Sequence, residues 1–163
     1  MVAHAVIKSV RMTPEDKEQS LHEFLRRYSS AVVAFSGGVD SSYLAYASNE
    51  VLGDAARAVT ALSPSVSELQ EKLVRDFVSA FKLNHCFVDT SEMENPEYTA
   101  NPTNRCYFCK SELFSRLDKL RAEWGIDVIF DGSNADDVGD YRPGRKAADE
   151  EQVVSPLIEV GMT

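Results

Sequence analysis

One short segment combines a glycine pair with several hydroxyl groups, which suits it to binding phosphate. It reads Ser36-Gly37-Gly38-Val39-Asp40-Ser41-Ser42 and follows apolar residues 31–35. Glycine has no Cβ, so the backbone can turn sharply with its N–H groups facing outward, and the helical pattern from Asp40 adds unpaired N–H groups and a positive dipole end. This predicts an anion site. The segment lacks the Lys and Ser/Thr of a Walker loop, and the alternative is an ordinary turn with an Asp or Ser helix cap.

A second polar segment carries paired carboxylates and is followed by basic residues. It begins after apolar residues 128–130 and reads Asp131-Gly132-Ser133-Asn134-Ala135-Asp136-Asp137. Asp136 and Asp137 are ligands of the kind that Mg²⁺ prefers, although they could also form a solvated acidic turn. Arg142, Arg145 and Lys146 are the densest basic cluster in the chain. They could neutralise phosphate or clamp a carboxylate, and the alternative is a set of solvated cations.

The cysteines allow two interpretations. Cys106 and Cys109 form a CxxC pair at an expected helix start, whereas Cys86 lies in an expected buried strand, where it would pack as a small hydrophobe. Zinc and iron–sulfur sites usually need four ligands, or three and an outside one. The pair is therefore either inert or part of a cluster or sulfur-handling site shared with residues outside the chain. An odd number of cysteines without an export signal indicates reduced thiols.

Composition bounds the class of protein. The chain has 163 residues, 44% of them hydrophobic, which corresponds to about one domain with its own core. We expect no membrane span, because no apolar run approaches the ~20 residues needed, and no signal peptide, which leaves the cytoplasm. The formal charge of −9 makes nucleic-acid binding unlikely.

Strand and helix patterns alternate along the chain. Strands are expected at residues 31–34, 56–62, 86–88 and 128–130. Helices are expected after Thr13, a cap followed by Pro14, from Asp40 to a stop at Gly53, and over 68–81 behind the cap Ser67. A last helix is expected to end at Gly125. The helix at 68–81 is expected to gather its apolar residues on one face, namely Leu69, Leu73, Phe77 and Ala80.

This alternation predicts an α/β fold with a doubly wound parallel sheet and helices on both of its faces. With strand order 3-2-1-4, the first and fourth strands are neighbours at the switch point, where a ligand is expected. The glycine segment and the paired acids follow these two strands, so Mg²⁺ could join them.

The string SGGVDSS resembles the signature of the PP-loop ATP pyrophosphatases, which cut ATP between the α- and β-phosphates. The resemblance implies a Rossmann-like fold of the adenine nucleotide alpha hydrolase (HUP) type. It also implies a pyrophosphate cradle in which the hydroxyls of Ser36, Ser41 and Ser42 add donors. The ATP-binding residues that it implies are Ser36, Gly37, Gly38, Val39, Asp40, Ser41, Ser42 and Gly132, with Leu62, Ser63 and Ser65 at the adenine.

A narrower resemblance joins several segments. SGGVDSS, CYFCK, DGSNADDxxDYRPGRKAAxE and VxSPLxExGMT, in this order, look like the N-terminal part of the LarE-type ATP-dependent sulfur transferases. That family adenylates a carboxylate of a nicotinate-derived mononucleotide and then transfers sulfur to it, for a nickel-pincer cofactor. The resemblance implies ATP, Mg²⁺ at Asp136, and an iron–sulfur cluster as an option at Cys106 and Cys109. It assigns catalysis to Asp40, Asp136 and Arg142, and substrate binding to Arg142 and Arg145.

The expected organisation is a helical lead-in at residues 1–30 and an ATP-pyrophosphatase domain at 31–163. In the family the chain continues into a second domain with a further cysteine, so we expect a truncation before the substrate and sulfur-transfer domain. We also expect a homo-oligomer. The alternatives are another PP-loop chemistry, either amidation or tRNA thiolation, and a module that senses ATP without turnover.

Overall fold

Four parallel strands form the centre of the computed structural model, which describes residues 11–90, 105–138, 147 and 153–163, with only the backbone of 105–109. The strands lie in the order β3-β2-β1-β4. Their bounds are Ala31–Ala34 for β1, Ala56–Leu62 for β2, His85–Asp89 for β3 and Val128–Phe130 for β4. The predicted α/β fold and strand order are confirmed, and only β3 is longer than expected, by one residue at each end.

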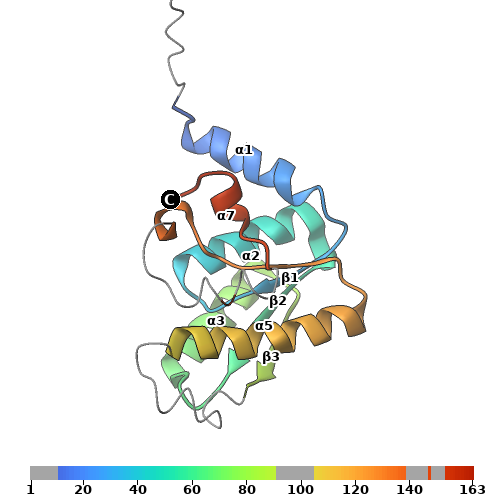
Figure 1. Ribbon diagram of the computed structural model, residues 1–163, viewed down its shortest axis with the longest axis vertical. Helices are drawn as coiled ribbons and strands as arrows, with labels where there is room; N and C mark the ends of the chain where they lie inside the picture. Colours follow the sequence, from blue (N-terminus) through green and yellow to red (C-terminus); the bar gives the residue numbers. More distant parts are fainter. Residues whose placement is uncertain (1–10, 91–104, 139–146, 148–152) are drawn as a thin grey trace, which may run out of the picture.

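Helices connect the strands (Figure 1). The longer ones are α1 (Pro14–Leu25), α2 (Val39–Leu52), α3 (Glu68–Phe81) and α5 (Arg105–Trp124), and the short ones are η1 (Gly53–Ala55), η4 (Ala135–Asp137) and α7 (Pro156–Glu159). The predicted caps are confirmed: the Thr13 hydroxyl accepts from Asp16 N–H, and the Ser67 hydroxyl accepts from Gln70 N–H. Within the described part of the chain, none of the helices is both long and apolar enough to span a bilayer.

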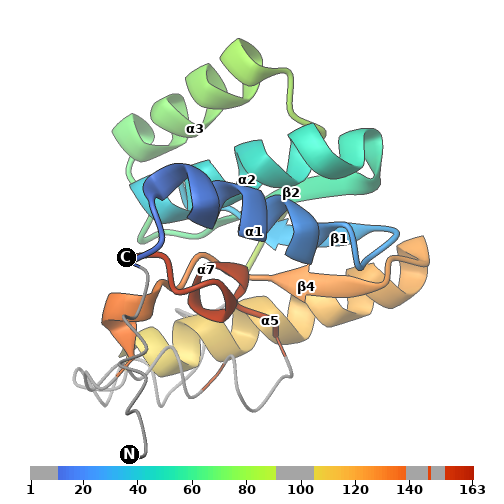
Figure 2. The same ribbon diagram turned by 90° about the horizontal axis from the view of Figure 1, so that it is seen from above.

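Alternate residues of the strands feed two hydrophobic clusters. Ala31 and Val33 of β1 contribute to a cluster that includes Leu21, Leu44 and Val74, from α1, α2 and α3. The intervening Val32 belongs to a second cluster, whose members on α5 are Phe114 and Leu117. Figure 2 shows the same arrangement, with α1, α2 and α3 on one side of the strands and α5 on the other. Both faces of the sheet are therefore covered, as expected for buried parallel strands.

The last described segment extends the sheet beside β4. Val154 pairs with Phe130 in a parallel bridge, and Val154 O accepts from Asp131 N–H at 3.0 Å. Leu157 of α7 is buried in the first cluster, and Met162 O accepts from Ala135 N–H at 2.6 Å. This segment is thereby held against the loop that follows β4.

One prediction about burial is wrong, and another holds in part. The apolar face expected for α3 is not the buried face: Leu69 and Leu73 are 67% and 56% exposed, whereas Val74 is fully buried. The side of the helix that carries Val74 is the one that packs against the protein, since Val74 lies against Gly37 of the loop after β1. Cys86 packs against the second cluster as a small hydrophobe, as predicted, but its strand β3 is only partly buried; this burial raises the pKa of the Cys86 thiol.

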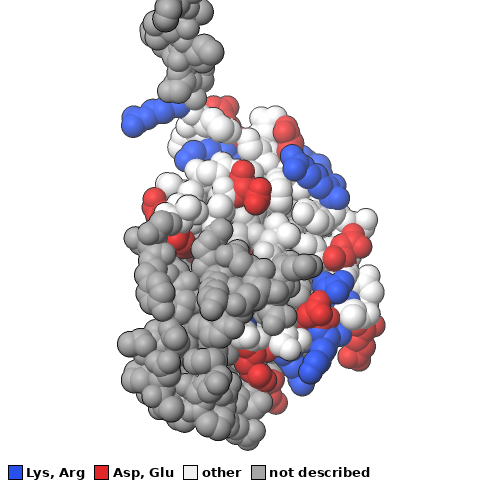
Figure 3. Space-filling model, viewed as in Figure 1, with Lys and Arg blue, Asp and Glu red and all other residues white. Residues whose placement is uncertain are grey.

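The described surface mixes the two signs of charge. On the face shown in Figure 3, Lys and Arg side chains are interspersed with Asp and Glu. Two ion pairs on α3 are examples, Lys72 with Asp76 and Arg75 with Glu71, each four residues apart. Exposed pairs of this kind contribute little to stability.

The difference in burial along α3 leads to a stability prediction. Val74→Ala removes two methyl groups from the core, and we expect the free energy of unfolding to fall by about 2 kcal/mol. Leu73→Ala removes more apolar atoms, but from an exposed side chain, so it should cost less than about 0.5 kcal/mol. Urea unfolding followed by circular dichroism measures both values. A larger loss for Leu73→Ala would mean that the face expected from the sequence is the buried one.

Candidate functional site

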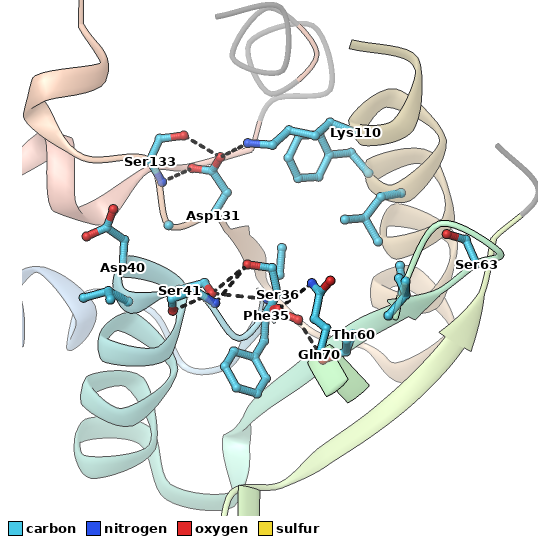
Figure 4. Close-up of a pocket in the computed structure, with 18 of the residues that line it drawn as sticks. Phe35, Ser36, Asp40, Ser41, Thr60, Ser63, Gln70, Lys110, Asp131 and Ser133 are labelled. Atoms are coloured by element: carbon cyan, nitrogen blue, oxygen red, sulfur yellow. Dashed lines mark hydrogen bonds and ion pairs between the residues drawn. The ribbon is translucent and has the colours of Figure 1, made fainter. Parts of the chain in front are cut away.

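A pocket of about 460 Å³ lies at the carboxyl ends of the central strands. Its walls come from the loops that follow β1, β2 and β4, from the first turns of α2 and α3, and from α5. Figure 4 shows Ser36, Ser41 and Gln70 on one side of it, and Lys110 and Asp131 on the other. The pocket therefore lies where the sequence places a ligand, between the first and fourth strands.

The glycine loop forms one wall and is held by its own serines. Ser36 N–H donates to Ser41 Oγ at 3.2 Å, and the two hydroxyls are 3.0 Å apart. Gly37 has a φ of +85°, a left-handed conformation that favours glycine. Gly38 is the N-cap of α2, and it supplies no side chain to bond the N–H groups that follow.

The start of α2 leaves its backbone donors unused. None of the hydrogen bonds among the described residues uses the N–H groups of Val39, Asp40 or Ser41. The alternative for this segment, a helix cap by an Asp or Ser side chain, does not form. Three N–H groups without a hydrogen-bond partner among the described residues therefore lie at the positive end of a 14-residue helix, on residues that line the pocket, which is the arrangement of an anion site.

The loop after β4 approaches this helix start very closely. A Cβ on Gly132 would lie 2.8 Å from Ser41 N, a backbone atom that cannot move aside without shifting α2. Beside it, Asn134 Nδ2 donates to Asp40 Oδ2 at 2.9 Å. The two polar segments singled out from the sequence are therefore in direct contact.

A buried carboxylate forms the opposite wall. Asp131 is 2% exposed. It accepts from the hydroxyl of Ser155 at 2.6 Å and from that of Ser133 at 2.8 Å. Lys110 Nζ, on a side chain that is 41% exposed, lies 3.8 Å from Asp131 Oδ2. Lys110 thus brings a positive charge to the pocket, and Asp131 holds it there.

Polar side chains also support the glycine loop from β2, β3 and α3. The Thr60 hydroxyl donates to Phe35 O at 2.7 Å and is 2.8 Å from His85 Nε2. Because the hydroxyl hydrogen is already used, His85 Nε2 is the donor in the second contact. Burial lowers the pKa of His85 to about 4, and the charge of Arg75 adds to this shift, so the ring is neutral at pH 7. Gln70 Nε2 donates to Ser36 O at 3.1 Å.

The residues predicted for the site fall into three groups. Those lining the pocket are Ser36, Gly38, Val39, Asp40, Ser41, Ser63, Ser65 and Gly132, whereas Gly37, Ser42, Leu62 and Asp136 are not part of its lining. Arg142 and Arg145 lie outside the described residues, as do the side chains of Cys106 and Cys109 in the first turn of α5. Asp136 is exposed, and its neighbour Asp137 lines the pocket instead.

Other lining residues were not selected from the sequence. These are chiefly Thr60, Gln70, Lys110, Asp131 and Ser133. Thr60 is a polar residue within an apolar strand, and Asp131 directly follows another such strand, so both carried a signal. Gln70 and Lys110 lie on helices among other polar residues, and nothing in their spacing distinguishes them.

The close approach at Gly132 leads to a second prediction. Gly132→Ala must push the β4 loop and α2 apart, and we expect it to lower the free energy of unfolding by about 1–3 kcal/mol. Gly38→Ala is the matched control, because its Cβ would meet Ser36 Oγ at an ordinary 3.6 Å. Guanidinium unfolding compares the two variants. Equal stability of both would contradict the tight contact between Gly132 and Ser41.

Sequence comparisons find curated relatives that are longer than this chain. No family model matches. The chain is 44% identical over 146 residues to the uncharacterized protein slr1717 of Synechocystis, covering 90% of this chain and 54% of that protein. It is 29% identical over 144 residues to the pyridinium-3,5-bisthiocarboxylic acid mononucleotide synthase of Lactiplantibacillus plantarum, covering 88% and 52%. The chain thus spans about half the length of the curated relatives that it matches.

Solved structures share the fold at low identity. The glutamine-dependent NAD⁺ synthetase of Acinetobacter baumannii, in complex with ADP, superposes with a TM-score of 0.70 at 14% identity, over 91% of this chain and 32% of that one. The U34-tRNA thiolase NcsA of Methanococcus maripaludis, with its 4Fe-4S cluster, gives 0.65 at 20% identity, over 88% and 59%. The strand order and these likenesses show that this chain shares the adenine nucleotide alpha hydrolase (HUP) type of α/β fold with the two structures.

Proposed function

We propose that this domain binds ATP with Mg²⁺ and cleaves it between the α- and β-phosphates, transferring the adenylate to a substrate carboxylate. The observation that carries the proposal is that the N–H groups of Val39, Asp40 and Ser41 have no hydrogen-bond partner among the described residues, while these three residues line a pocket of about 460 Å³. A pocket of this size between two loops of an α/β sheet suits a nucleotide. The likeness to a synthase of a thiocarboxylic acid mononucleotide supports a carboxylate of a mononucleotide as the substrate group.

In this proposal the departing pyrophosphate lies against the glycine loop. Negative charge develops on it as a carboxylate oxygen forms its bond to the α-phosphorus and the bond to the bridging oxygen of the β-phosphate breaks. The N–H groups at the start of α2, the hydroxyl of Ser36 and the ammonium of Lys110 stabilise this charge. No protein nucleophile is needed, so the rate enhancement comes from positioning and electrostatics. The apolar Leu113 and Phe114 line the pocket and offer a surface for adenine.

The acidic residues of the pocket fit a magnesium ion that is shared with the nucleotide. Asp40 and Asp137 both line the pocket, and carboxylates are hard oxygen ligands. Among the described residues there is no group of three or more His, Cys, Asp or Glu side chains that could hold a metal by itself. This is the usual situation for Mg²⁺, which takes one or two carboxylates together with phosphate oxygens and waters. When bound, the ion would offset the charge of the pyrophosphate.

We further propose that the domain belongs to a LarE-type sulfur transferase. The substrate would then be a nicotinate-derived mononucleotide, with its carboxylate held by Arg142 and Arg145. Sulfur transfer would need residues of a second domain, consistent with relatives of which this chain spans only about half. Cys106 and Cys109 would be ligands of an iron–sulfur cluster completed from outside this chain.

A second candidate function is tRNA thiolation. It is favoured by the likeness in fold to the U34-tRNA thiolase, at 20% identity. The net charge of −9 favours a small carboxylate substrate over tRNA, because RNA binding normally requires a basic surface.

Pyrophosphate release tests the proposed function. We expect the chain to bind Mg²⁺-ATP in calorimetry and to release pyrophosphate when pyridinium-3,5-biscarboxylic acid mononucleotide is added. α,β-Methylene-ATP, whose bridge cannot be cut, should bind without release. Release stimulated by bulk tRNA instead would favour thiolation. Binding without release under any condition would leave an ATP-sensing module.

The magnesium ligands can be distinguished by matched substitutions. Because Asp137 lines the pocket and Asp136 is exposed outside it, we expect Asp137→Asn to weaken Mg²⁺-ATP binding by at least about tenfold, or about 1.4 kcal/mol. Asp136→Asn should change it by less than about twofold. Calorimetric titrations with and without Mg²⁺ separate metal from nucleotide effects. A greater loss in Asp136→Asn would restore the assignment that the resemblance implies.

A further inference from the structure

Two side chains outside the glycine segment bond the carbonyls of the residues that lead into it. The Thr60 hydroxyl donates to Phe35 O at 2.7 Å, and Gln70 Nε2 donates to Ser36 O at 3.1 Å. Phe35 and Ser36 directly precede Gly37. From these contacts we propose that Gln70, together with Thr60, is a positioning residue that sets the conformation of the phosphate-binding loop. The proposal rests on the function proposed above.

The two carbonyls belong to successive peptide groups, Phe35–Ser36 and Ser36–Gly37, and the first of these lies where β1 leaves the sheet. The paired register of β1 with β2 ends at Ala34 and Val59, and Phe35 N–H still donates to Val59 O. Beyond this point the Thr60 side chain bonds the Phe35 carbonyl. The other end of the same peptide is also held, because Ser36 N–H donates to Ser41 Oγ at 3.2 Å. This plane is therefore fixed at both ends.

The second plane depends on Gln70. It joins Ser36 to Gly37, and no hydrogen bond of the described residues uses Gly37 N–H. A peptide group is planar, and the chain has no cis peptide bonds among its described residues, so the bond to Ser36 O also sets the direction of Gly37 N–H. From this plane the chain turns through the φ of +85° at Gly37 into the start of α2. Releasing the plane would therefore release the turn.

Gln70 is itself held in place. Its backbone N–H donates to the Ser67 hydroxyl that caps α3, which fixes the first turn of the helix next to the loop. One turn later, Val74 of α3 packs against Gly37, where an added Cβ would lie 2.9 Å from Val74 Cγ2. The Gln70 side chain lines the pocket, where a bound ligand would exclude water and strengthen its bond to Ser36.

The test compares two glutamines of the same chain. Gln70→Met keeps the length of the side chain and removes its donor. Gln19→Met is the matched control, because Gln19 lies on α1, outside the pocket, and the only described hydrogen bond of its side chain is the one from Nε2 to Glu23 Oε1, at 3.2 Å. Calorimetry with Mg²⁺-α,β-methylene-ATP and with adenosine separates effects on phosphate from effects on the nucleoside. The ¹⁵N-resolved amide resonance of Gly37 reports on the loop without any ligand.

For Gln70→Met we expect about threefold to tenfold weaker binding of the ATP analogue, the size of one hydrogen bond, with adenosine binding changed by less than about twofold. The Gly37 amide resonance should shift or broaden in this variant and stay in place in Gln19→Met. An unchanged Gly37 resonance would overturn the proposal. Equal losses for adenosine and the ATP analogue would also overturn it, because Gln70 would then contact the nucleoside directly.

Failure of the proposed function gives a different pattern. If the wild-type chain does not bind the ATP analogue, ATP binding is refuted, while the Gly37 resonance still reports whether Gln70 holds the loop. Thr60→Val provides an independent check at the other carbonyl. It keeps the shape of the side chain, and we expect the Ser36 amide resonance to move, because the Phe35–Ser36 plane loses one of its two anchors.

Discussion

The site depends most on the interactions of one buried carboxylate, that of Asp131. A charge at 2% exposure destabilises a fold unless it is bonded, and hydroxyls of Ser133 and Ser155 and the ammonium of Lys110 provide its partners. Ser133 lies in the loop after β4, Ser155 lies just before α7, and Lys110 is on α5. Asp131 therefore joins three separate parts of the chain at the pocket wall, and removing one partner would cost about 1–3 kcal/mol.

The wall formed by the start of α2 depends on a different constraint, the pairing of the parallel strands β1 and β4. Because β1 and β4 pair directly, the loops that follow them emerge at the same edge of the sheet. Gly132 then meets the backbone at Ser41, and Asn134 bonds Asp40. These contacts hold the start of α2 in place without using its N–H groups. A rigid helix start with unused donors is what anion binding requires, since little reorganisation is then needed when the ligand arrives.

The sequence by itself determined the fold class, the strand order and most element bounds. Three of the four strands have the bounds expected from the pattern of apolar residues. The helix caps Thr13 and Ser67 also form as predicted. It also determined where the pocket lies, because glycine and polar residues follow β1 and β4. Local sequence is sufficient for such features, since propensity, capping and burial period act within a few residues of one another.

Tertiary structure alone decided which side chains of α3 and α5 reach the pocket. Gln70 and Lys110 reach it because α3 and α5 pack beside the sheet at particular rotations, and a surface helix pattern does not reveal that rotation. The same reason explains why Val74 rather than Leu73 is buried, and why Asp137 rather than Asp136 lines the pocket. In each case two adjacent positions carry chemically similar side chains, and the rotation of the helix about its axis decides which of the two faces the rest of the protein. Such a choice depends on contacts between segments far apart in the chain, which no local pattern encodes.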